Sequence, residues 1–212
     1  MKSFKIVIIG ETGTGKTSII NKYIKNTYNK SIYSTIGVDF FEKILIHSNI
    51  TYNLQIWDLS GIDRFHSIIR TYYVNTNAVI LTYDTNNIKS LYGLNKWIND
   101  INNIYQDSQS LDIIRHNRPI FILVGTKIDK NNTKINTNII QKFIKDNHID
   151  LSIECSSKYN QNINEIFDIL LNNMIQNQSN NSNNSIDSIN NSNNSSNKTC
   201  SFCSSCSTCY II

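Results

Sequence analysis

The sequence has no long apolar run and no dense positive charge, and its amino-terminal residues do not predict a cleavable leader. No apolar stretch reaches the roughly 18 residues of a membrane-spanning helix, and the amino-terminal residues contain no small-residue cleavage site of a secretory signal peptide. The net charge is only +4, and the 20 basic residues are scattered along the 212-residue chain, which predicts no binding of nucleic acid. With 40% apolar residues, the chain can still build a core, and its length predicts one domain with a tail.

Glycine is also scarce, yet three of the seven glycines lie within residues 10–15. There GETGTGKT follows the apolar run FKIVII and has the form G-x-x-x-x-G-K-[ST] of a phosphate-binding loop, or P-loop. The alternative is a flexible glycine turn beside a chance lysine, but such a match should arise by accident in only about one chain in a hundred. Lys16 would reach the β- and γ-phosphates, and the Thr17 hydroxyl would bind Mg²⁺. The residues expected at the phosphates are Gly10, Glu11, Thr12, Gly13, Thr14, Gly15, Lys16, Thr17 and Ser18.

The composition of the chain changes near Met174 and predicts three regions. Residues 1–175 contain the apolar segments of a folded domain. Residues 176–199 are almost entirely Asn, Ser and Gln, which cannot bury enough surface to offset the entropy of ordering, so they are predicted to be a disordered linker. Residues 200–212 form a cysteine-rich tail.

Strand-like and helix-like segments alternate through the folded region, which predicts a three-layer α/β fold of the P-loop type. The continuous apolar runs AVILTY and IFILVG are typical of central parallel strands, whereas FFEKILIH and TYNLQIW alternate and predict an antiparallel hairpin at one edge. The sheet should therefore have six strands, mostly parallel with one antiparallel edge strand, and helices on both faces. The expected strands are Phe4–Ile9, Val38–His47, Thr51–Trp57, Ala78–Tyr83, Ile120–Val124 and Leu151–Glu154. The expected helices are Lys16–Lys25, Arg64–Val74, Ser90–Tyr105, Thr137–Asn147 and Ile163–Ile175.

Four further short motifs, three at strand ends and one in a loop, indicate which nucleotide is bound. In WDLSG, Asp58 can hold Mg²⁺ and Gly61 can offer its N–H to the γ-phosphate; in the polar loop STIG, Thr35 can close over the metal. In GTKID, the Asp129 carboxylate can accept both N–H donors on one edge of guanine, which adenine cannot match. The motif ECSSK, residues 154–158, ends the sixth strand and could add backbone N–H donors to the guanine oxygen. Each motif alone is weak, but their order along the chain favours a GTP site over an ATP site. The residues expected at the guanine base are Thr126, Lys127, Asp129, Ser156, Ser157 and Lys158.

With these residues in place, the sequence resembles the small GTPases of the Ras superfamily, and among them the Rab family. The resemblance covers Phe4 to about Met174 and is carried by STIGVDF, LQIWD, DRF, YY and LTYD. It implies that Tyr28 packs on the guanine and that the switch that meets effectors includes Thr35, Ile36, Gly37, Val38, Asp39 and Phe40. It also implies a monomer that works with an exchange factor, a GTPase-activating protein, a GDP-dissociation inhibitor and effectors. For Tyr72 and Tyr73, effector recognition and ordinary packing are equally favoured.

Several positions depart from the family pattern. Where the family has D-T-A-G-Q-E-R-F, this chain has DLSGIDRF, so Ile62 replaces the glutamine that orients the attacking water and Ser60 replaces an alanine beside the γ-phosphate. Isoleucine can neither donate nor accept a hydrogen bond, which predicts very slow intrinsic hydrolysis. Thr126 replaces the asparagine of N-K-x-D, a change that the Rho branch shares. Residues 106–118 form a longer and more polar segment than usual.

The carboxyl-terminal CSFCSSCSTCYII repeats cysteine every three residues. An iron–sulfur run lacks its adjoining fold here, and disulfides do not suit a cytosolic chain. The final CYII fits a C-a-a-X box with a large apolar last residue, so Cys209 is the expected site of geranylgeranylation. One lipid rarely anchors a protein stably, and few basic residues are available, so Cys206, Cys203 and Cys200 are candidates for a second lipid.

Together these features predict a Rab-like switch that binds GTP or GDP with Mg²⁺, hydrolyses GTP slowly and regulates vesicle traffic. The chain should be lipid-anchored on the cytosolic face of a membrane, with a cytosolic pool. The alternative function is a hydrolysis-deficient module that stays loaded with GTP and recruits effectors constitutively.

Overall fold

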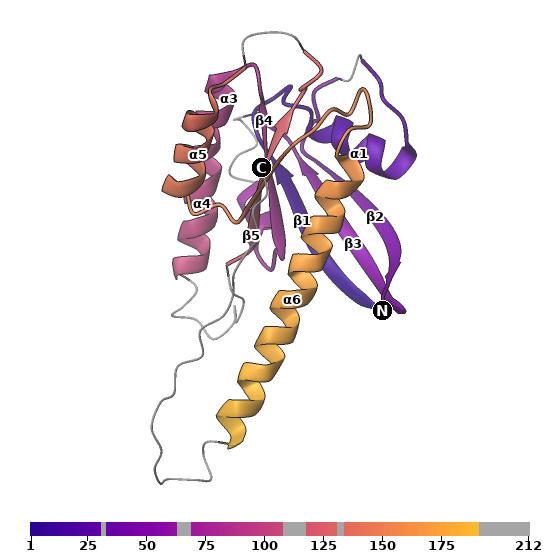
Figure 1. Ribbon diagram of the computed structural model, residues 1–212, viewed down its shortest axis with the longest axis vertical. Coiled ribbons are helices and arrows are strands. Elements are labelled where there is room, and N and C mark those ends of the chain that lie inside the picture. Colours follow the sequence, from indigo (N-terminus) through magenta and orange to yellow (C-terminus); the bar gives the residue numbers. More distant parts are fainter. Residues whose placement is uncertain (31–32, 63–68, 108–117, 131–133, 191–212) are drawn as a thin grey trace. The chain divides into compact units, whose positions relative to one another are not determined.

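Six strands form one sheet in this computed structural model, which describes residues 1–30, 33–62, 69–107, 118–130 and 134–190 (Figure 1). The order across the sheet is β2-β3-β1-β4-β5-β6, and only β2 runs antiparallel to its neighbour. The predicted sheet with one antiparallel edge strand is thereby confirmed. The strands are β1 (Lys2–Ile9), β2 (Val38–His47), β3 (Ile50–Leu59), β4 (Ala78–Asp84), β5 (Ile120–Thr126) and β6 (Leu151–Glu154).

The strand order follows from the apolar patterns of the strands. Every residue of β4 and of β5 is buried, because helices cover both faces of these central strands. Along β2, more exposed and less exposed side chains alternate, as expected for an edge strand. The turn between β2 and β3 consists of Ser48 and Asn49, whose positive φ angles of 50° and 62° suit a tight two-residue hairpin.

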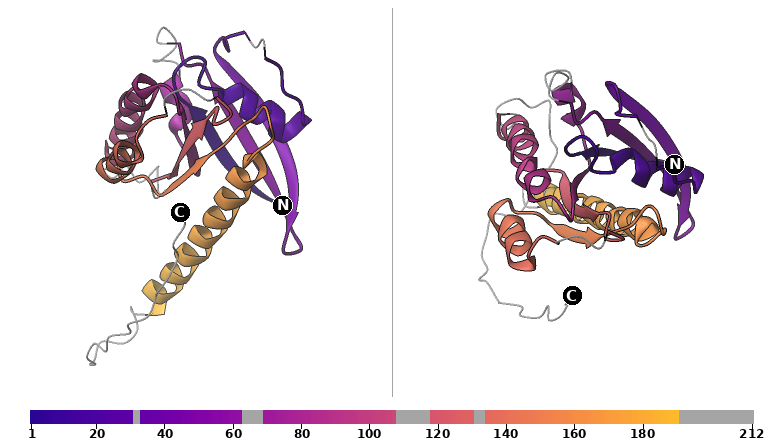
Figure 2. Two further views of the ribbon diagram at one scale, coloured as in Figure 1. Left: turned by 45° about the horizontal axis from the view of Figure 1, so that its top comes forward. Right: turned by 90° about the horizontal axis from the view of Figure 1, so that it is seen from above.

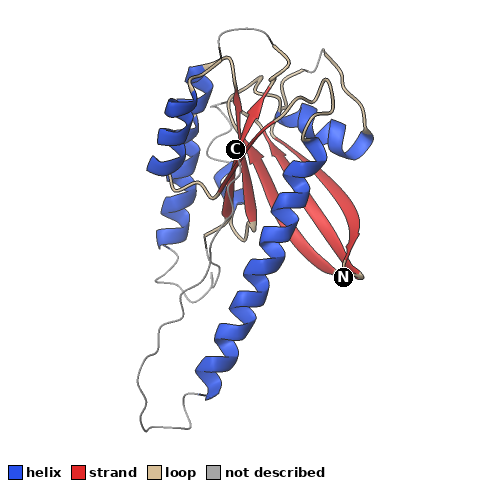
Figure 3. Cartoon of the chain, viewed as in Figure 1, coloured by secondary structure: helices blue, strands red, loops and turns tan. Residues whose placement is uncertain are grey.

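Helices pack on both faces of the sheet and complete three layers, as predicted (Figures 2 and 3). On one face, α1 and the first part of α6 bury apolar side chains against the sheet; on the other, α3, α4 and α5 do so together with the 3-10 helix η2. The carboxyl ends of the parallel strands then meet at one edge of the sheet, where P-loop proteins bind ligands. The helical elements are α1 (Lys16–Lys25), η2 (Arg70–Tyr73), α3 (Ile88–Tyr92), α4 (Leu94–Asp107), α5 (Thr137–Asp146) and α6 (Ile163–Asn190).

Two predicted helices are corrected by the structure. The segment Ser90–Tyr105 forms two helices, α3 and α4, which meet at Gly93. A Cβ atom at Gly93 would collide with the side chain of Glu11, so the P-loop packs against the backbone at the junction. Of the predicted helix Arg64–Val74, the described part from Arg70 to Tyr73 is a 3-10 helix, and residues 63–68 lie outside the described residues.

The range predicted as a disordered linker also needs correction in part. The chain divides into two units, Met1–Ile175 and Gln176–Ile212, but α6 continues through residues 176–190. A helix already nucleated by an apolar segment extends at little cost, since each further residue adds one backbone hydrogen bond. The rest of the predicted linker (191–199), the cysteine tail (200–212) and most of the 106–118 segment lie outside the described residues. Within the described part of the chain, no helix combines the length and the apolarity that crossing a membrane requires.

Candidate functional site

The P-loop connects β1 to α1 at the carboxyl edge of the sheet. Its last glycine, Gly15, has φ of 100° and immediately precedes α1, so the positive end of the helix faces the space above the loop. Lys16 is only 5% exposed, and its Nζ atom donates to the backbone oxygens of Gly10 at 2.9 Å and Glu11 at 3.1 Å. Burial lowers the pKa of Lys16 to about 8, against the opposing effect of Asp58 and Glu11. An anion bound here would therefore stabilise the lysine charge.

Three buried threonines hold the P-loop against the sheet. Thr14 Oγ1 shares a hydrogen bond of 3.0 Å with Thr82 Oγ1 of β4, and Thr82 Oγ1 in turn lies 2.9 Å from the backbone oxygen of Ile9. Thr126 Oγ1, at the end of β5, lies 2.5 Å from the backbone oxygen of Thr14 and 2.9 Å from that of Tyr83. Thr126 therefore ties the P-loop to the loop that carries the predicted guanine-binding residues.

The three predicted magnesium ligands lie together. Thr17 Oγ1 donates to Asp58 Oδ2 at 2.5 Å, and Thr35 Oγ1 lies 2.9 Å from Thr17 Oγ1 and 3.4 Å from Asp58 Oδ2. Burial raises the pKa of Asp58 to about 6, while the Thr17 hydrogen bond and the Lys16 charge oppose this rise. Asp58 Oδ1 is buried and has no hydrogen-bond partner among the described residues.

A cation at this point would satisfy the buried carboxylate, and hard hydroxyl and carboxylate oxygens are the ligands that Mg²⁺ prefers. The residues present therefore fit a magnesium ion held by Thr17, Thr35 and Asp58, directly or through water.

The segment after β3 closes directly on the P-loop. A Cβ atom at Gly61 would lie 2.5 Å from Thr12 N and 2.6 Å from the backbone oxygen of Gly10, so only glycine fits this approach. Ser60, in the same segment, is buried against the loop before β2. Ile62 is half-buried and has no polar side-chain atom.

The predicted switch residues that enter β2 expose apolar side chains. Ile36 is 75% exposed and Phe40 is 45% exposed. The Phe40 ring lies 4.6 Å from that of Trp57, which lies 5.2 Å from that of Tyr72. Tyr72 therefore shares the face of Phe40, which favours a role in recognition, whereas Tyr73 is fully buried in the core, which favours packing.

The two predicted guanine motifs also meet. The Cys155 N–H donates to the Gly125 oxygen at 2.7 Å, and Ser156 Oγ donates to Asp129 Oδ1 at 2.6 Å, so Ser156 orients the carboxylate. Lys127 Nζ donates to the Gly13 oxygen at 2.6 Å and lies 2.8 Å from Asp84 Oδ2. Lys127 thus connects the loop that contains GTKID to the P-loop.

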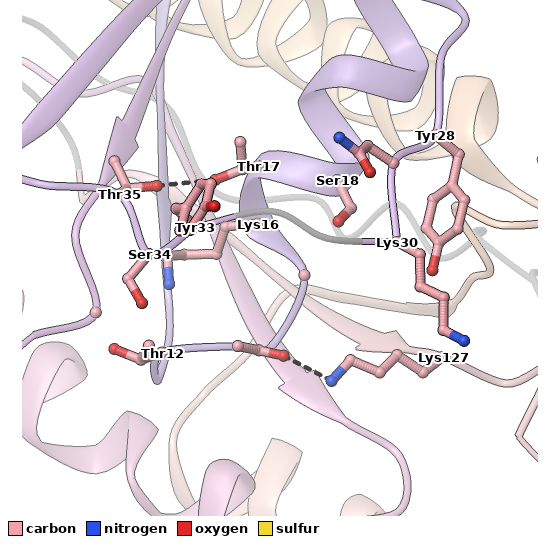
Figure 4. A pocket seen from close by; sticks show the side chains of 14 residues that line it. Thr12, Lys16, Thr17, Ser18, Tyr28, Lys30, Tyr33, Ser34, Thr35 and Lys127 are labelled. Atoms are coloured by element: carbon pink, nitrogen blue, oxygen red, sulfur yellow. Dashed lines mark hydrogen bonds between the residues drawn. The ribbon is translucent and has the colours of Figure 1, made fainter.

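An open cleft of about 250 Å³ lies between the P-loop and the loop that precedes β2 (Figure 4). Ten residues that the sequence analysis singled out line the cleft, namely Thr12, Gly13, Gly15, Lys16, Thr17, Ser18, Tyr28, Thr35, Gly61 and Lys127. Asp58 and Thr126 lie beneath the cleft, whereas Glu11 turns away from it and pairs with Lys96 at 3.5 Å. The remaining residues expected at the phosphates or at the base do not line the cleft, namely Gly10, Thr14, Asp129, Ser156, Ser157 and Lys158.

Sequence reasoning missed four residues that line the cleft: Asn29, Lys30, Tyr33 and Ser34. All four lie between Tyr28 and Thr35, two residues that the sequence did single out. Tyr33 is 95% exposed, and an aromatic residue next to STIG in a polar loop was the signal that could have identified it.

Comparison with known proteins identifies the family. The family model described as the Ras family matches residues 5–176. The chain therefore belongs to the Ras family, and it is a small GTPase of a family whose members bind guanine nucleotides.

Within this family the chain is Rab-like. It is 31% identical over 174 residues to the Ras-related protein Rab-18 of Lymnaea stagnalis, which covers 82% of this chain and 81% of that protein. It is 30% identical over 178 residues to the Ras-related protein Rab-7L1 of Homo sapiens, which covers 83% of this chain and 84% of that protein. It is also 29% identical over 176 residues to Rab-18-B of Danio rerio.

Proposed function

We propose that this small GTPase is a Rab-like switch that regulates vesicle and membrane traffic by alternating between GTP and GDP. The observation that carries the proposal is the cluster of Thr17, Thr35 and Asp58 beside Lys16. In such a cluster, a threonine of the loop before β2 meets the metal site, so its position can report whether the γ-phosphate is present. Mg²⁺, when bound, would neutralise charge on the phosphates.

Each part of the candidate site, in the cleft and at the Asp129 loop, has a proposed role. Lys16 and the P-loop N–H groups bind the β- and γ-phosphates, and Gly61 offers its N–H to the γ-phosphate. Asp129, oriented by Ser156, accepts the N–H donors of guanine, and Tyr28 covers the base. Loss of the γ-phosphate removes one of the contacts that hold Thr35 and Gly61, which weakens the closed arrangement of the apolar surface that includes Ile36 and Phe40.

We propose that intrinsic hydrolysis is very slow because Ile62 cannot orient the attacking water. Removing a polar group that stabilises a transition state costs on the order of 2–4 kcal/mol, and the loss here is smaller if the intrinsic reaction is already poor. A GTPase-activating protein that supplies its own polar groups would restore turnover. An exchange factor, a GDP-dissociation inhibitor and effectors complete the proposed cycle, and a lipid on Cys209, with a second on Cys206, Cys203 or Cys200, would hold the chain on the cytosolic face of a membrane.

The second candidate function is a module that remains loaded with GTP and recruits effectors constitutively. The half-buried, apolar Ile62 favours it, because an isoleucine can neither orient nor activate a water molecule.

Single-turnover GTP hydrolysis by the purified chain separates these functions. GTP binding that excess ATP does not displace is the first requirement, and its absence would refute both. We then expect Ile62→Gln to hydrolyse GTP faster than the parent, and the matched apolar variant Ile62→Leu to remain as slow as the parent. A parent that already matches Ile62→Gln would show that another group orients the water. Turnover that appears only with an activating protein supports the cycling switch, and none under any condition supports the constitutive module.

A further inference from the structure

The Ser60 hydroxyl bridges the two segments that close over the cleft. Ser60 is only 3% exposed, and its Oγ atom donates to the backbone oxygen of Thr35 at 2.8 Å. The same Oγ atom accepts a hydrogen bond of 3.3 Å from the N–H of Ile62. The loop before β2 and the segment after β3 are thus joined through one side-chain oxygen.

A backbone hydrogen bond lies beside this bridge. The Ser60 N–H donates to the oxygen of Gly37 at 2.9 Å, and any residue other than proline could make that contact at position 60. The hydroxyl adds one donated and one accepted hydrogen bond, which is the combination that a serine can supply and an alanine cannot. The serine side chain therefore adds to a closed arrangement that the backbone alone holds less firmly.

The bridge acts on a residue of the metal site. Thr35 is held at its carbonyl by Ser60 and at its hydroxyl by Thr17, 2.9 Å away. Fixing the Thr35 backbone limits how far its hydroxyl can move from Asp58, which lies 3.4 Å away. Each of these contacts joins two groups of the protein itself.

We propose that Ser60 is a positioning residue that holds the loop before β2 closed over the nucleotide site, so that bound nucleotide leaves slowly and the closed form depends less on the γ-phosphate. This inference rests on the proposed function, because it needs a guanine nucleotide in the cleft. Opening the loop to release nucleotide must break the Ser60–Thr35 hydrogen bond. A bridge of this kind keeps the closed form populated in the GDP state as well.

The test compares Ser60→Ala with a matched control, Ser90→Ala. Ser90 is also buried, and its hydroxyl also connects two backbone groups, donating to the Asn87 oxygen at 2.6 Å and accepting from the Asp84 N–H at 3.0 Å. It lies outside the residues that line the cleft. Both substitutions delete one buried hydroxyl, so general destabilisation should affect both variants alike.

Release of a fluorescent GDP analogue is measured with saturating Mg²⁺ for both variants and the parent. We expect Ser60→Ala to release GDP about two- to tenfold faster than the parent, the factor that one hydrogen bond of ordinary net strength provides, and Ser90→Ala to match the parent. Ser60→Thr, which keeps a hydroxyl, should stay slow. Hydrogen exchange of the GDP-bound proteins should rise in peptides covering residues 33–40 for Ser60→Ala alone.

The outcomes separate this inference from the proposed function. Tight GDP binding with equal release from Ser60→Ala and the parent would overturn the role of Ser60 and leave the GTPase function intact. Equal acceleration by Ser90→Ala would also overturn it, since the effect would then come from general destabilisation. A folded parent that binds no GDP would overturn the proposed function, and this inference with it.

Discussion

Replacing Thr126 by valine tests whether one hydroxyl joins the phosphate and guanine halves of the site. Thr126 is 3% exposed, and its Oγ1 atom lies 2.5 Å from the Thr14 oxygen and 2.9 Å from the Tyr83 oxygen. Valine has nearly the same shape but no donor, so a buried carbonyl oxygen loses its partner. Such a loss costs about 1–3 kcal/mol, and we expect the free energy of unfolding to fall by that amount.

The assay is equilibrium unfolding in urea with saturating Mg²⁺ and GDP, so that ligand concentration does not differ between variants. Thr126→Ser is the matched control, since it keeps the hydroxyl and removes one methyl group, which contributes about 0.8 kcal/mol. We also expect Thr126→Val to release GDP faster, because the P-loop is held less firmly. Unchanged unfolding of Thr126→Val, or a larger loss in Thr126→Ser, would refute the reasoning.

Three further predictions concern other parts of the site. Gly61→Ala introduces a methyl group 2.5 Å from Thr12 N, which should cost the closed form about 1–3 kcal/mol; competition binding should show a lower GTP affinity relative to GDP, and an unchanged ratio would contradict the close approach. Asp58→Ala should make GDP release insensitive to Mg²⁺, whereas chelation should accelerate release from the parent; a retained response to chelator would exclude Asp58 from the metal site. Burial alone would raise the pKa of Asp84, but hydrogen bonds from Lys127 and Asn86 outweigh it and lower the pKa from its ordinary value of 3.8. Ionised Asp84 therefore stabilises the fold above that value, and this contribution is lost as the pH falls through the lowered pKa; urea unfolding of Asp84→Asn should show a weaker loss of stability in acid than the parent, and equal acid sensitivity would contradict it.

Local sequence patterns correctly predicted those strands and helices in which burial alone decides the residue types. The runs in β4 and β5 are buried on both sides, so continuous apolar sequence indicated central strands. The prediction of a single helix over Ser90–Tyr105 failed because a contact with a residue far away in the sequence divides this segment. The apolar periodicity of Ser90–Tyr105 continues through Gly93, but the packing of Glu11 at that point is invisible in the local sequence.

In the candidate site, too, local motifs predicted some features, whereas others depend on contacts between distant segments. Lys16, Thr17 and Asp58 were predicted from motifs, and they do lie together. The direction of the Glu11 side chain, away from the cleft toward Lys96, was not predictable because a P-loop motif specifies the backbone rather than this side chain. Tyr33 was missed for a related reason, since none of the motifs includes residues 29–33.

The sequence by itself determined the order of elements, the P-loop and the residue types available to phosphate, metal and guanine, because these depend on spacing and on chemistry that each short segment carries. Only the tertiary structure decided which of those residues contact one another. The hydrogen bonds from Ser60 to Thr35 and from Thr126 to Thr14 join segments that are far apart along the chain. Such contacts arise because the folded sheet brings the end of β3 beside the loop before β2 and the end of β5 beside the P-loop, and no local pattern in the sequence records these approaches.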